Sequence, residues 1–240
     1  MDKFLIKGPC KIKGKISVEP SKNSSLPILA STLLFDQPVV IKNLPRVKDI
    51  ETMISLLQSL GSKIIFSKDK RSVKIINKKK LKTFASYSIV KKMRGSFLVL
   101  GPLIAKYYNS KCSLPGGCNL GARPVNYHLQ ALKKLGMNYH LKDGYILGKS
   151  KGKLKGTKIN FPKISVGATE NTIIAASLAK GETTLKNCAI EPEIKDLTNF
   201  LNLAGAKIKW SGRTCNIIGV NSLKETKYSV MADRIMAGTF

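Results

Sequence analysis

Residues 50–65, IETMISLLQSLGSKII, decide how this chain folds. Their apolar side chains recur at helical spacing from Ile50 to Leu60, which predicts an amphipathic helix. Gly61 ends the pattern and suits the left-handed conformation that commonly closes a helix. A strand is expected to begin directly afterwards, at residues 62–65. The stretch therefore predicts one unit made of a helix, a glycine stop and a strand.

The same arrangement recurs twice along the chain. Residues 125–139 predict a helix that stops at Gly136 and a strand that leads into a hairpin turn at residues 142–145, KDGY. Residues 194–209 predict a helix that stops at Gly205 and another strand. The three glycines stand 75 and 69 residues apart, so the repeating unit is roughly seventy residues of mixed helix and strand.

The first and third units also match before these segments. Each opens with a predicted buried helix, at residues 26–34 and 173–179, and a predicted strand ending in Lys-Asn follows in both. The tripeptide Ile-Ser-Val at 16–18 and at 164–166 is interpreted as a further match in the same register, 148 residues apart. We expect an α/β (α+β) fold in which three units pack their helices toward a shared centre with sheets outside. The alternative is a generic α+β fold whose leucine–glycine helix ends recur by chance.

The composition excludes several classes of protein. A chain of 240 residues with 43% hydrophobic and 23% charged residues is typical of a globular protein of one or two domains. The longest nearly apolar stretch, residues 97–105, is far shorter than the roughly 20 residues that span a membrane. The N-terminus has no secretory signal pattern. We therefore expect a cytoplasmic location and no membrane partner.

The formal net charge of +28 indicates an affinity for anions. Lysine outnumbers arginine 36 to 6, although arginine is better suited to bidentate recognition of phosphates and bases. The lysines are scattered and are not interleaved with aromatic residues, as a nucleic-acid stacking platform would require. We expect no nucleic-acid partner and interpret most of this charge as solvated surface.

Metal, nucleotide and redox chemistry find no support in the motifs. The five cysteines include no CxxC pair, and neither histidine lies at metal-ligand spacing from one, so we expect no metal. The chain has no phosphate-binding GxxxxGK[ST] loop and no GxGxxG dinucleotide motif. We expect free thiols and interpret four of them as small buried hydrophobic side chains, namely Cys10, Cys112, Cys188 and Cys215.

Residues 113–124, SLPGGCNLGARP, form the segment that best suits chemistry. Three glycines and two prolines predict a loop whose backbone can approach a ligand closely. Cys118 lies within it, five residues before Arg123, and a thiol in such a loop can act as a proton donor or a nucleophile. Lys22 and Asn23, and separately Arg94, precede apolar helices, where they could hold a phosphate or a carboxylate.

Seven segments in this order resemble the signature blocks of the UDP-N-acetylglucosamine 1-carboxyvinyltransferases, enolpyruvyl transferases of peptidoglycan precursor synthesis. The segments span the chain, and they are residues 20–27 (PSKNSSLP), 93–96 (MRGS), 114–118 (LPGGC), 121–125 (GARPV), 165–171 (SVGATEN), 191–194 (EPEI) and 233–235 (DRI). The resemblance implies two inside-out α/β barrels of three units each, with the active site between them. It implies that residues 22–228 are one complete three-unit barrel, and that residues 1–21 and 229–240 belong to a second barrel mostly missing from this chain.

The implied reaction moves the enolpyruvyl group of phosphoenolpyruvate to the 3-hydroxyl of UDP-N-acetylglucosamine and needs no cofactor. The enol carbon must be protonated, the hydroxyl must lose a proton, and cations must hold the phosphate and the carboxylate. By resemblance Cys118 is the proton donor and the thiol that fosfomycin alkylates, while phosphoenolpyruvate is held by Lys22, Asn23 and Arg123. The residues implied to line the nucleotide-sugar pocket are Arg94, Arg123, Pro124, Val125, Asn126, Tyr127, Lys163, Ile164, Ser165 and Val166.

The sequence departs from the family pattern at a few positions. Pro20-Ser21 replaces a usual Gly-Ala, Gly95 replaces alanine, Asn126 replaces aspartate, and Met236 stands where glutamate is common. The family's general-base aspartate and an arginine that clamps phosphoenolpyruvate are expected beyond residue 240, in a second barrel supplied in cis or in trans. We therefore expect residues 1–240 alone to bind ligand weakly and to turn over negligibly. The alternatives are a 3-phosphoshikimate enolpyruvyl transferase-like enzyme and a non-catalytic basic binding protein.

Overall fold

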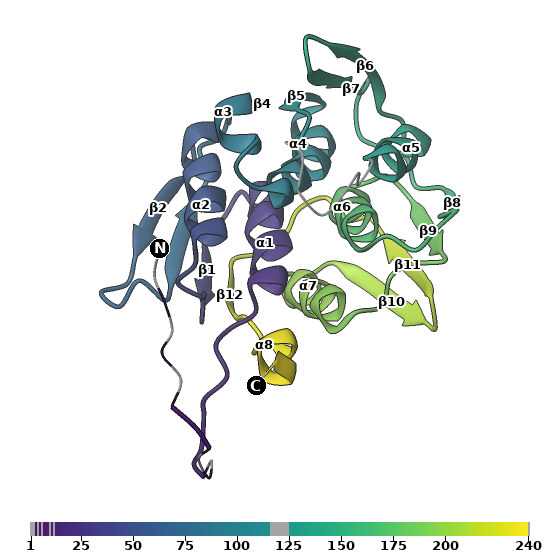
Figure 1. Cartoon of the computed structure of the whole chain (residues 1–240). Helices are drawn as coiled ribbons and strands as arrows, with labels where there is room; N and C mark the ends of the chain where they lie inside the picture. The colour runs from purple at the N-terminus through teal and green to yellow at the C-terminus, as the bar shows by residue number, and fades with distance from the viewer. Residues whose placement is uncertain are drawn as a thin grey trace.

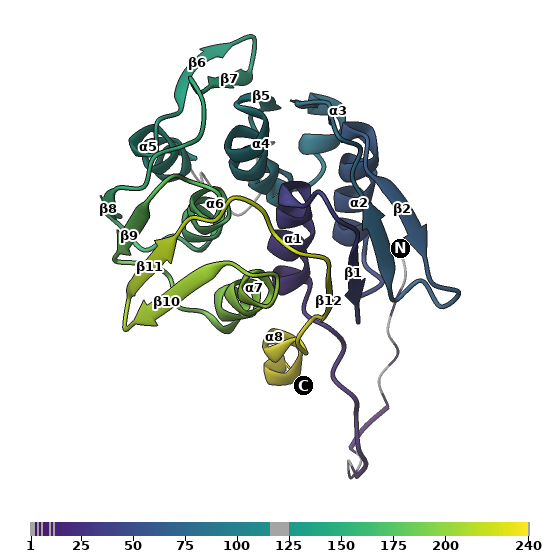
Figure 2. The same cartoon turned by 180° about the vertical axis from the view of Figure 1, so that it is seen from behind.

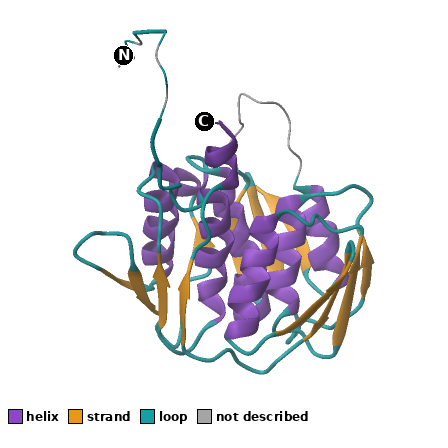
Figure 3. Cartoon of the chain, turned by 90° about the horizontal axis from the view of Figure 1, so that it is seen from below, coloured by secondary structure: helices purple, strands orange, loops and turns teal. Residues whose placement is uncertain are grey.

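A computed structural model describes residues 3, 5, 7–9, 11, 13–115 and 125–239 (Figure 1). These residues form three sheets that surround a bundle of helices, so the predicted arrangement of helices inside and sheets outside is confirmed. Figure 3 shows the helices gathered at the centre with the strands at the periphery. The fold is thus an inside-out α/β barrel, in which the sheets cover the helices.

Each of the three sheets has four strands and the same pairing pattern. The first two strands in spatial order run parallel, and the remaining pairs are antiparallel. In that order the first sheet contains β12 (Thr226–Ser229), β1 (Val39–Lys42), β3 (Val73–Ile76) and β2 (Lys63–Phe66). The second contains β4 (Phe84–Ala85), β5 (Asn109–Ser113), β7 (Tyr145–Lys149) and β6 (Asn138–Lys142). The third contains β8 (Lys158–Asn160), β9 (Glu182–Lys186), β11 (Thr214–Ile218) and β10 (Lys207–Ser211).

Each unit contributes an inner and an outer helix to the bundle. The inner helices are α1 (Lys22–Ser31), α4 (Leu100–Tyr107) and α6 (Val166–Ala176). The outer helices are α2 (Lys48–Leu60), α5 (Asn126–Lys134) and α7 (Pro192–Leu203). The shorter helical segments are η1 (Thr32–Leu34), α3 (Tyr87–Val90), η2 (Arg94–Val99), which runs directly into α4, and α8 (Arg234–Thr239).

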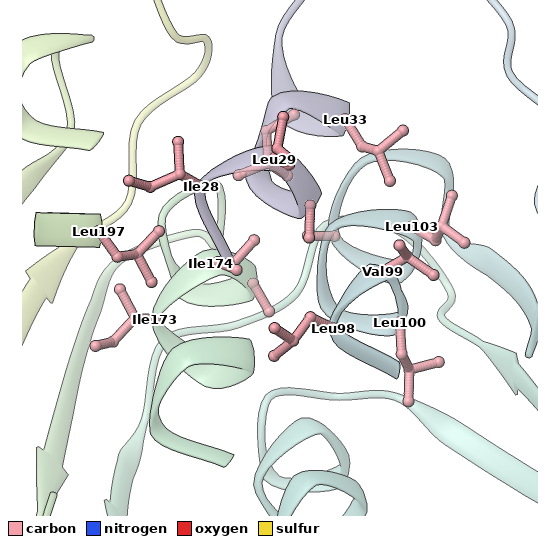
Figure 4. Close-up of a cluster of buried hydrophobic side chains, with 14 of the residues drawn as sticks. Ile28, Leu29, Leu33, Leu98, Val99, Leu100, Leu103, Ile173, Ile174 and Leu197 are labelled. Carbon is pink, nitrogen blue, oxygen red and sulfur yellow. The ribbon is translucent and has the colours of Figure 1, made fainter. Parts of the chain in front are cut away.

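The inner helices are buried on nearly every side, which is the reason that they form the centre of the fold. Every residue of α1 from Ser24 to Ser31 is buried, as is every residue of α6 from Ala168 to Ala176. A helix without a polar face is stable in water only when other elements cover it all round. Figure 4 shows side chains of α1, α4 and α6 meeting in one cluster, among them Leu29, Leu100 and Ile174.

The glycine stops and the hairpin are confirmed. Gly61, Gly136 and Gly205 have φ of 107°, 109° and 98°, a conformation that other residues adopt only with strain. At the turn between β6 and β7, Asp143 and Gly144 both have positive φ, as the tight hairpin predicted at residues 142–145 requires.

The Ile-Ser-Val match is wrong in its register. The structure aligns Ser21 with Ser165, because each caps its inner helix by accepting a hydrogen bond from a backbone N–H three residues later. These serines are 144 residues apart, as are Gly61 and Gly205, whereas the tripeptides are 148 residues apart. Residues 16–18 lie before the cap Ser21, whereas Ser165 is itself the cap, so the two tripeptides occupy different places in their units.

The chain segments that lead into and out of the barrel pair with each other through their backbones. The backbone N–H of Ser21 donates to the carbonyl of Met231 at 2.8 Å, and that of Asp233 donates to the carbonyl of Glu19 at 2.8 Å. Figure 2 shows the segment after β11 crossing the helices to place β12 beside β1, so the end of the third unit closes the sheet of the first.

A buried carboxylate, that of Asp196, binds the outgoing segment of this pair to the helix bundle. Asp196 on α7 accepts hydrogen bonds from the hydroxyl of Ser24 on α1, from the Tyr228 hydroxyl at 2.6 Å and from the Met231 N–H at 3.3 Å. A buried carboxylate with three donors is well satisfied, whereas an unpaired one would be costly.

In the described part of the chain, none of the helices has both the length and the apolar character needed to cross a bilayer.

Truncation of a central side chain should destabilise the whole barrel. Leu29 on α1 is fully buried, so we expect Leu29→Ala to lower the free energy of unfolding by about 2–5 kcal/mol. Leu203 on α7 is 61% exposed and provides the matched control, for which we expect a loss below about 1 kcal/mol. Urea unfolding followed by circular dichroism measures both. Equal losses for the two variants would contradict a dry centre built from the inner helices.

Candidate functional site

A cleft of about 580 Å³ lies where the inner helices begin. Lys22 and Asn23 at the start of α1 line it, together with Arg94 at the start of η2 and Val166 at the start of α6. Each of the three units therefore contributes the first residues of a helical segment. The N-terminal turns of α1 and α6 present backbone N–H groups and positive helix-dipole ends, which favour a bound anion.

The ammonium group of Lys22 is held at the cleft by an ion pair. Its Nζ lies 3.0 Å from Oδ2 of Asp49, which stands in the first turn of α2. Both side chains are more than one-third exposed, so the pair contributes at most about 1 kcal/mol to stability. An anionic ligand can therefore replace Asp49 as the partner of Lys22 at little cost to the fold.

A second ion pair, between Glu193 and Arg234, also lines the cleft. Glu193 in the first turn of α7 is buried and accepts three hydrogen bonds from Arg234 of α8, two from Nε at 3.0 and 3.4 Å and one from Nη2 at 3.2 Å. Glu191, the N-cap residue of the same helix, also lines the cleft. Its Oε2 is buried and has no hydrogen-bond partner among the described residues. The start of α7 thus presents one carboxylate that already accepts hydrogen bonds and one with an oxygen that can still accept a hydrogen bond.

Glu170 of α6 also lines the cleft. Its side chain is buried, and burial raises its pKa well above the ordinary value, with the negative charges of Glu193 and Glu191 adding to the effect. The neutral, protonated form of Glu170 is therefore favoured. Among the described residues that line the cleft, five side chains are basic and four are acidic, and the raised pKa of Glu170 adds to the excess of positive charge.

His128 of α5 also lines the cleft and is held neutral. Burial, with a further contribution from the charge of Arg94, lowers the pKa of His128 to about 3. A neutral imidazole beside a guanidinium can donate a hydrogen bond to a ligand without adding charge.

The structure brings together five of the residues predicted for substrate binding. They come from all three units and line the same cleft, namely Lys22, Asn23, Arg94, Val125 and Val166. This convergence joins segments that are up to 144 residues apart in the sequence.

Five other predicted residues do not line this cleft. Asn126 is exposed and Tyr127 packs against the core at the start of α5. Lys163 and Ile164 are exposed before α6, and the Ser165 hydroxyl accepts from the Ala168 N–H as the helix cap. For Ser165 the reason is local, because a capping side chain folds back on its own helix.

The remaining predicted residues lie outside the described residues. They are Cys118, Arg123 and Pro124, in the segment between Pro115 and Val125.

Four cysteines were predicted to be structural. Three of them, Cys112, Cys188 and Cys215, are buried free thiols, which confirms the prediction for them, and Cys10 is outside the described residues. Burial raises the pKa of Cys112 to about 12 and that of Cys188 to about 11, so both are poor nucleophiles.

Among the described residues that line the cleft, sequence analysis missed eight with a charge or hydrogen-bonding capacity. These functional candidates are Asp49, Lys91, Lys92, His128, Glu170, Glu191, Glu193 and Arg234. Four of the eight stand within the seven segments that carry the resemblance, which was the available signal. Asp49 and His128 gave no such signal, because only the packing of α2 and α5 brings them to the cleft.

Comparison with known protein families and curated proteins gives consistent matches. Residues 6–240 match the family model of EPSP synthase (3-phosphoshikimate 1-carboxyvinyltransferase). The whole chain is 59% identical to a UDP-N-acetylglucosamine 1-carboxyvinyltransferase of Pelagibacter ubique and 45% identical to one of Acinetobacter baylyi, covering 57% of each relative. The chain thus spans about half the length of the curated relatives it matches.

Solved structures show the same fold. The enolpyruvyl transferase NikO of Streptomyces tendae superimposes with a TM-score of 0.83 over 97% of this chain and 55% of its own, at 19% identity. An EPSP synthase of Acinetobacter baumannii superimposes with a TM-score of 0.74 over 92% of this chain and 50% of its own, also at 19% identity. These likenesses establish the architecture.

The buried carboxyl of Glu170 should make stability depend on pH. The folded chain binds this proton more tightly than the unfolded chain does, so stability falls as the pH rises from the ordinary glutamate pKa of 4.5 toward the raised folded value. Glu170→Gln removes this dependence. We expect the variant to gain stability relative to the parent by up to about 1.4 kcal/mol per pH unit across that window.

Urea unfolding of both chains at about pH 5 and about pH 8 measures this difference, and titrations common to both chains cancel. A difference that stays constant with pH would show that Glu170 is ionised in the folded chain.

Proposed function

The chain belongs to the EPSP synthase family of carboxyvinyl transferases, and on that premise we propose that it serves the transfer of enolpyruvyl from phosphoenolpyruvate to the 3-hydroxyl of UDP-N-acetylglucosamine. One observation carries the proposal: residues from three units that the family resemblance assigns to two phosphorylated substrates line a single basic cleft. The curated relatives at 44–59% identity support this choice of acceptor.

Each described residue of the cleft suits a distinct part of the reaction. Lys22 and Asn23 would hold phosphoenolpyruvate, because an ammonium group and an amide donor at a helix N-terminus match its phosphate and carboxylate. Arg94, with Val125 and Val166 beside it, would hold the nucleotide sugar, whose diphosphate suits a guanidinium.

Cys118 would supply the acid step. Its thiol would protonate the methylene carbon of phosphoenolpyruvate while the deprotonated sugar oxygen bonds to the adjacent carbon. Loss of phosphate and of a methyl proton from that adduct then restores the double bond in the product. The segment that contains Cys118 is followed by Val125, which lines the cleft, and this supports a place for the thiol near the substrates.

We further propose the division of the chain that the resemblance implies. Residues 22–228 would form the three-unit barrel, and residues 1–21 and 229–240 would belong to a second barrel that supplies a general base and a further arginine. The paired backbones of residues 19–21 and 231–233 support this division, because both segments leave the barrel at one place. A role in peptidoglycan precursor synthesis would place the protein in the cytoplasm, where nucleotide sugars are made.

Ligand binding separates this proposal from its two alternatives. Saturation-transfer NMR suits weak affinities and can compare UDP-N-acetylglucosamine with shikimate 3-phosphate and with duplex DNA. We expect the nucleotide sugar to bind and Arg94→Ala to weaken it about 10-fold or more, because hydrogen bonds to charged groups contribute about 1.5–3 kcal/mol. Lys63→Ala, on an exposed position of β2, is the control and should bind as the parent does.

Preference for shikimate 3-phosphate would favour the sister activity of the family. Strongly salt-dependent DNA binding without affinity for the nucleotide sugar would favour a basic binding protein.

Alkylation by fosfomycin tests the predicted acid directly. A thiolate opens the epoxide ring of fosfomycin and leaves a covalent adduct on sulfur, so intact mass spectrometry should show one adduct per chain. Peptide mapping should place it on Cys118, and Cys118→Ser should abolish it. Cys112 and Cys188 should stay unmodified in the folded chain because their pKa values are raised and both are buried. An unmodified Cys118 would contradict the role proposed for it.

A further inference from the structure

The amide side chain of Asn171 bridges a break in the neighbouring inner helix. At the junction of η2 and α4, its Oδ1 accepts from the backbone N–H of Gly101 at 2.8 Å, and its Nδ2 donates to the carbonyl of Phe97 at 3.4 Å. In a continuous α-helix, Gly101 would donate directly to Phe97 four residues earlier. The amide therefore supplies both partners that this backbone pair needs.

Only glycine at position 101 permits this insertion. A Cβ added there would lie 2.2 Å from Oδ1 of Asn171 and 2.6 Å from its carbonyl oxygen. Asn171 is itself fully buried, so its amide has no access to water as a substitute partner. Gly101 and Asn171 thus act together to join α6 to the η2–α4 junction.

The two backbone groups fix which way the amide points. A backbone N–H can only donate and a carbonyl can only accept, so Oδ1 must face Gly101 and Nδ2 must face Phe97. The remaining hydrogen on Nδ2 is then available to Nδ1 of His128, which lies 3.1 Å away. His128 Nδ1 must accept this hydrogen bond, and a neutral imidazole that accepts at Nδ1 carries its proton on Nε2.

The packing of His128 leaves Nε2 beside a glycine that lines the cleft. Its ring stands edge-on to Phe97, with ring centroids 5.2 Å apart. On the Nε2 side the neighbour is Gly167, where an added Cβ would lie 3.2 Å from Nε2. His128 and Gly167 both line the cleft, and glycine leaves the imidazole edge uncovered by a side chain. Burial and the charge of Arg94 keep the ring neutral, which preserves this single proton.

We propose that Asn171 is a positioning residue that fixes the tautomer of His128, so that its Nε2–H donates a hydrogen bond to an acceptor oxygen of the nucleotide sugar in the cleft. This inference rests on the proposed function for the identity of the ligand. The tautomer itself does not depend on that function. A neutral donor beside Arg94 adds directional recognition of an oxygen without placing a second cation next to the guanidinium.

Nitrogen NMR of the imidazole rings tests the tautomer. The chain contains two histidines, so ¹⁵N-histidine labelling gives two sets of signals, and His140→Gln on the exposed strand β6 assigns them. We expect His128 to show a protonated Nε2 and an unprotonated Nδ1. Asn171→Asp replaces the donor with a carboxylate and should move the proton to Nδ1, a change that a purely structural role would not produce. A parent His128 protonated at Nδ1 would overturn the inference.

Affinity for UDP-N-acetylglucosamine tests the donor. His128→Gln retains an amide donor near the position of Nε2, whereas the amide of His128→Asn ends near Nδ1. We expect His128→Asn to weaken binding about 5- to 10-fold and His128→Gln to stay within about 3-fold of the parent, as one hydrogen bond predicts. These variants keep the inference testable even if Asn171→Asp does not fold.

Two outcomes separate this inference from the proposed function. If the parent binds the nucleotide sugar and His128→Asn binds it equally well, the inference fails and the proposed function stands. If the parent does not bind the nucleotide sugar at all, both the proposed function and the donor role fail, whatever tautomer is found.

Discussion

The mutual burial of α1, α4 and α6 is the constraint on which the rest of the structure depends. Three helices that are buried on nearly every side must cover one another and be covered by the outer helices and sheets. Their packing fixes where each begins. The starts of α1, η2 and α6 therefore meet at one cleft, although each belongs to a different unit.

Two polar side chains buried in the bundle, Asp196 and Asn171, have hydrogen-bond partners there. Asp196 lies where three donors reach it, and Asn171 has backbone partners of fixed polarity. At the cleft, Glu191 keeps one oxygen without a partner among the described residues, and burial raises the pKa of Glu170 well above its ordinary value. A buried carboxyl group that lacks a partner or has a shifted pKa is typical of a surface that meets ligands.

Local patterns in the sequence were sufficient to predict most of the fold. The glycine stops, the hairpin at residues 142–145 and the placement of helices inside the sheets were all confirmed. The first two follow from spacing within one unit, and the third follows from the recurrence of that unit. The Ile-Ser-Val register was wrong because a tripeptide carries no information about which serine caps a helix. The structure answers that question through the hydrogen bonds of Ser21 and Ser165.

The cleft was less predictable, because it is assembled from separate units. Lys22 and Arg94 could be selected from their positions before apolar helices. Asp49 and His128 could not, since nothing near them in the sequence shows that α2 and α5 turn these side chains toward the other units. The same limit applies to the amide bridge, whose members Gly101 and Asn171 are 70 residues apart.

Hydrogen–deuterium exchange with and without UDP-N-acetylglucosamine tests the central claim most directly. Amides in the first turn of a helix lack partners within that helix, so a ligand held there slows their exchange. The account predicts slower exchange at the starts of α1, η2 and α6 together, with the outer sheets unchanged. Protection confined to one unit, or found on the outer sheets instead, would contradict a single cleft formed by the convergence of all three.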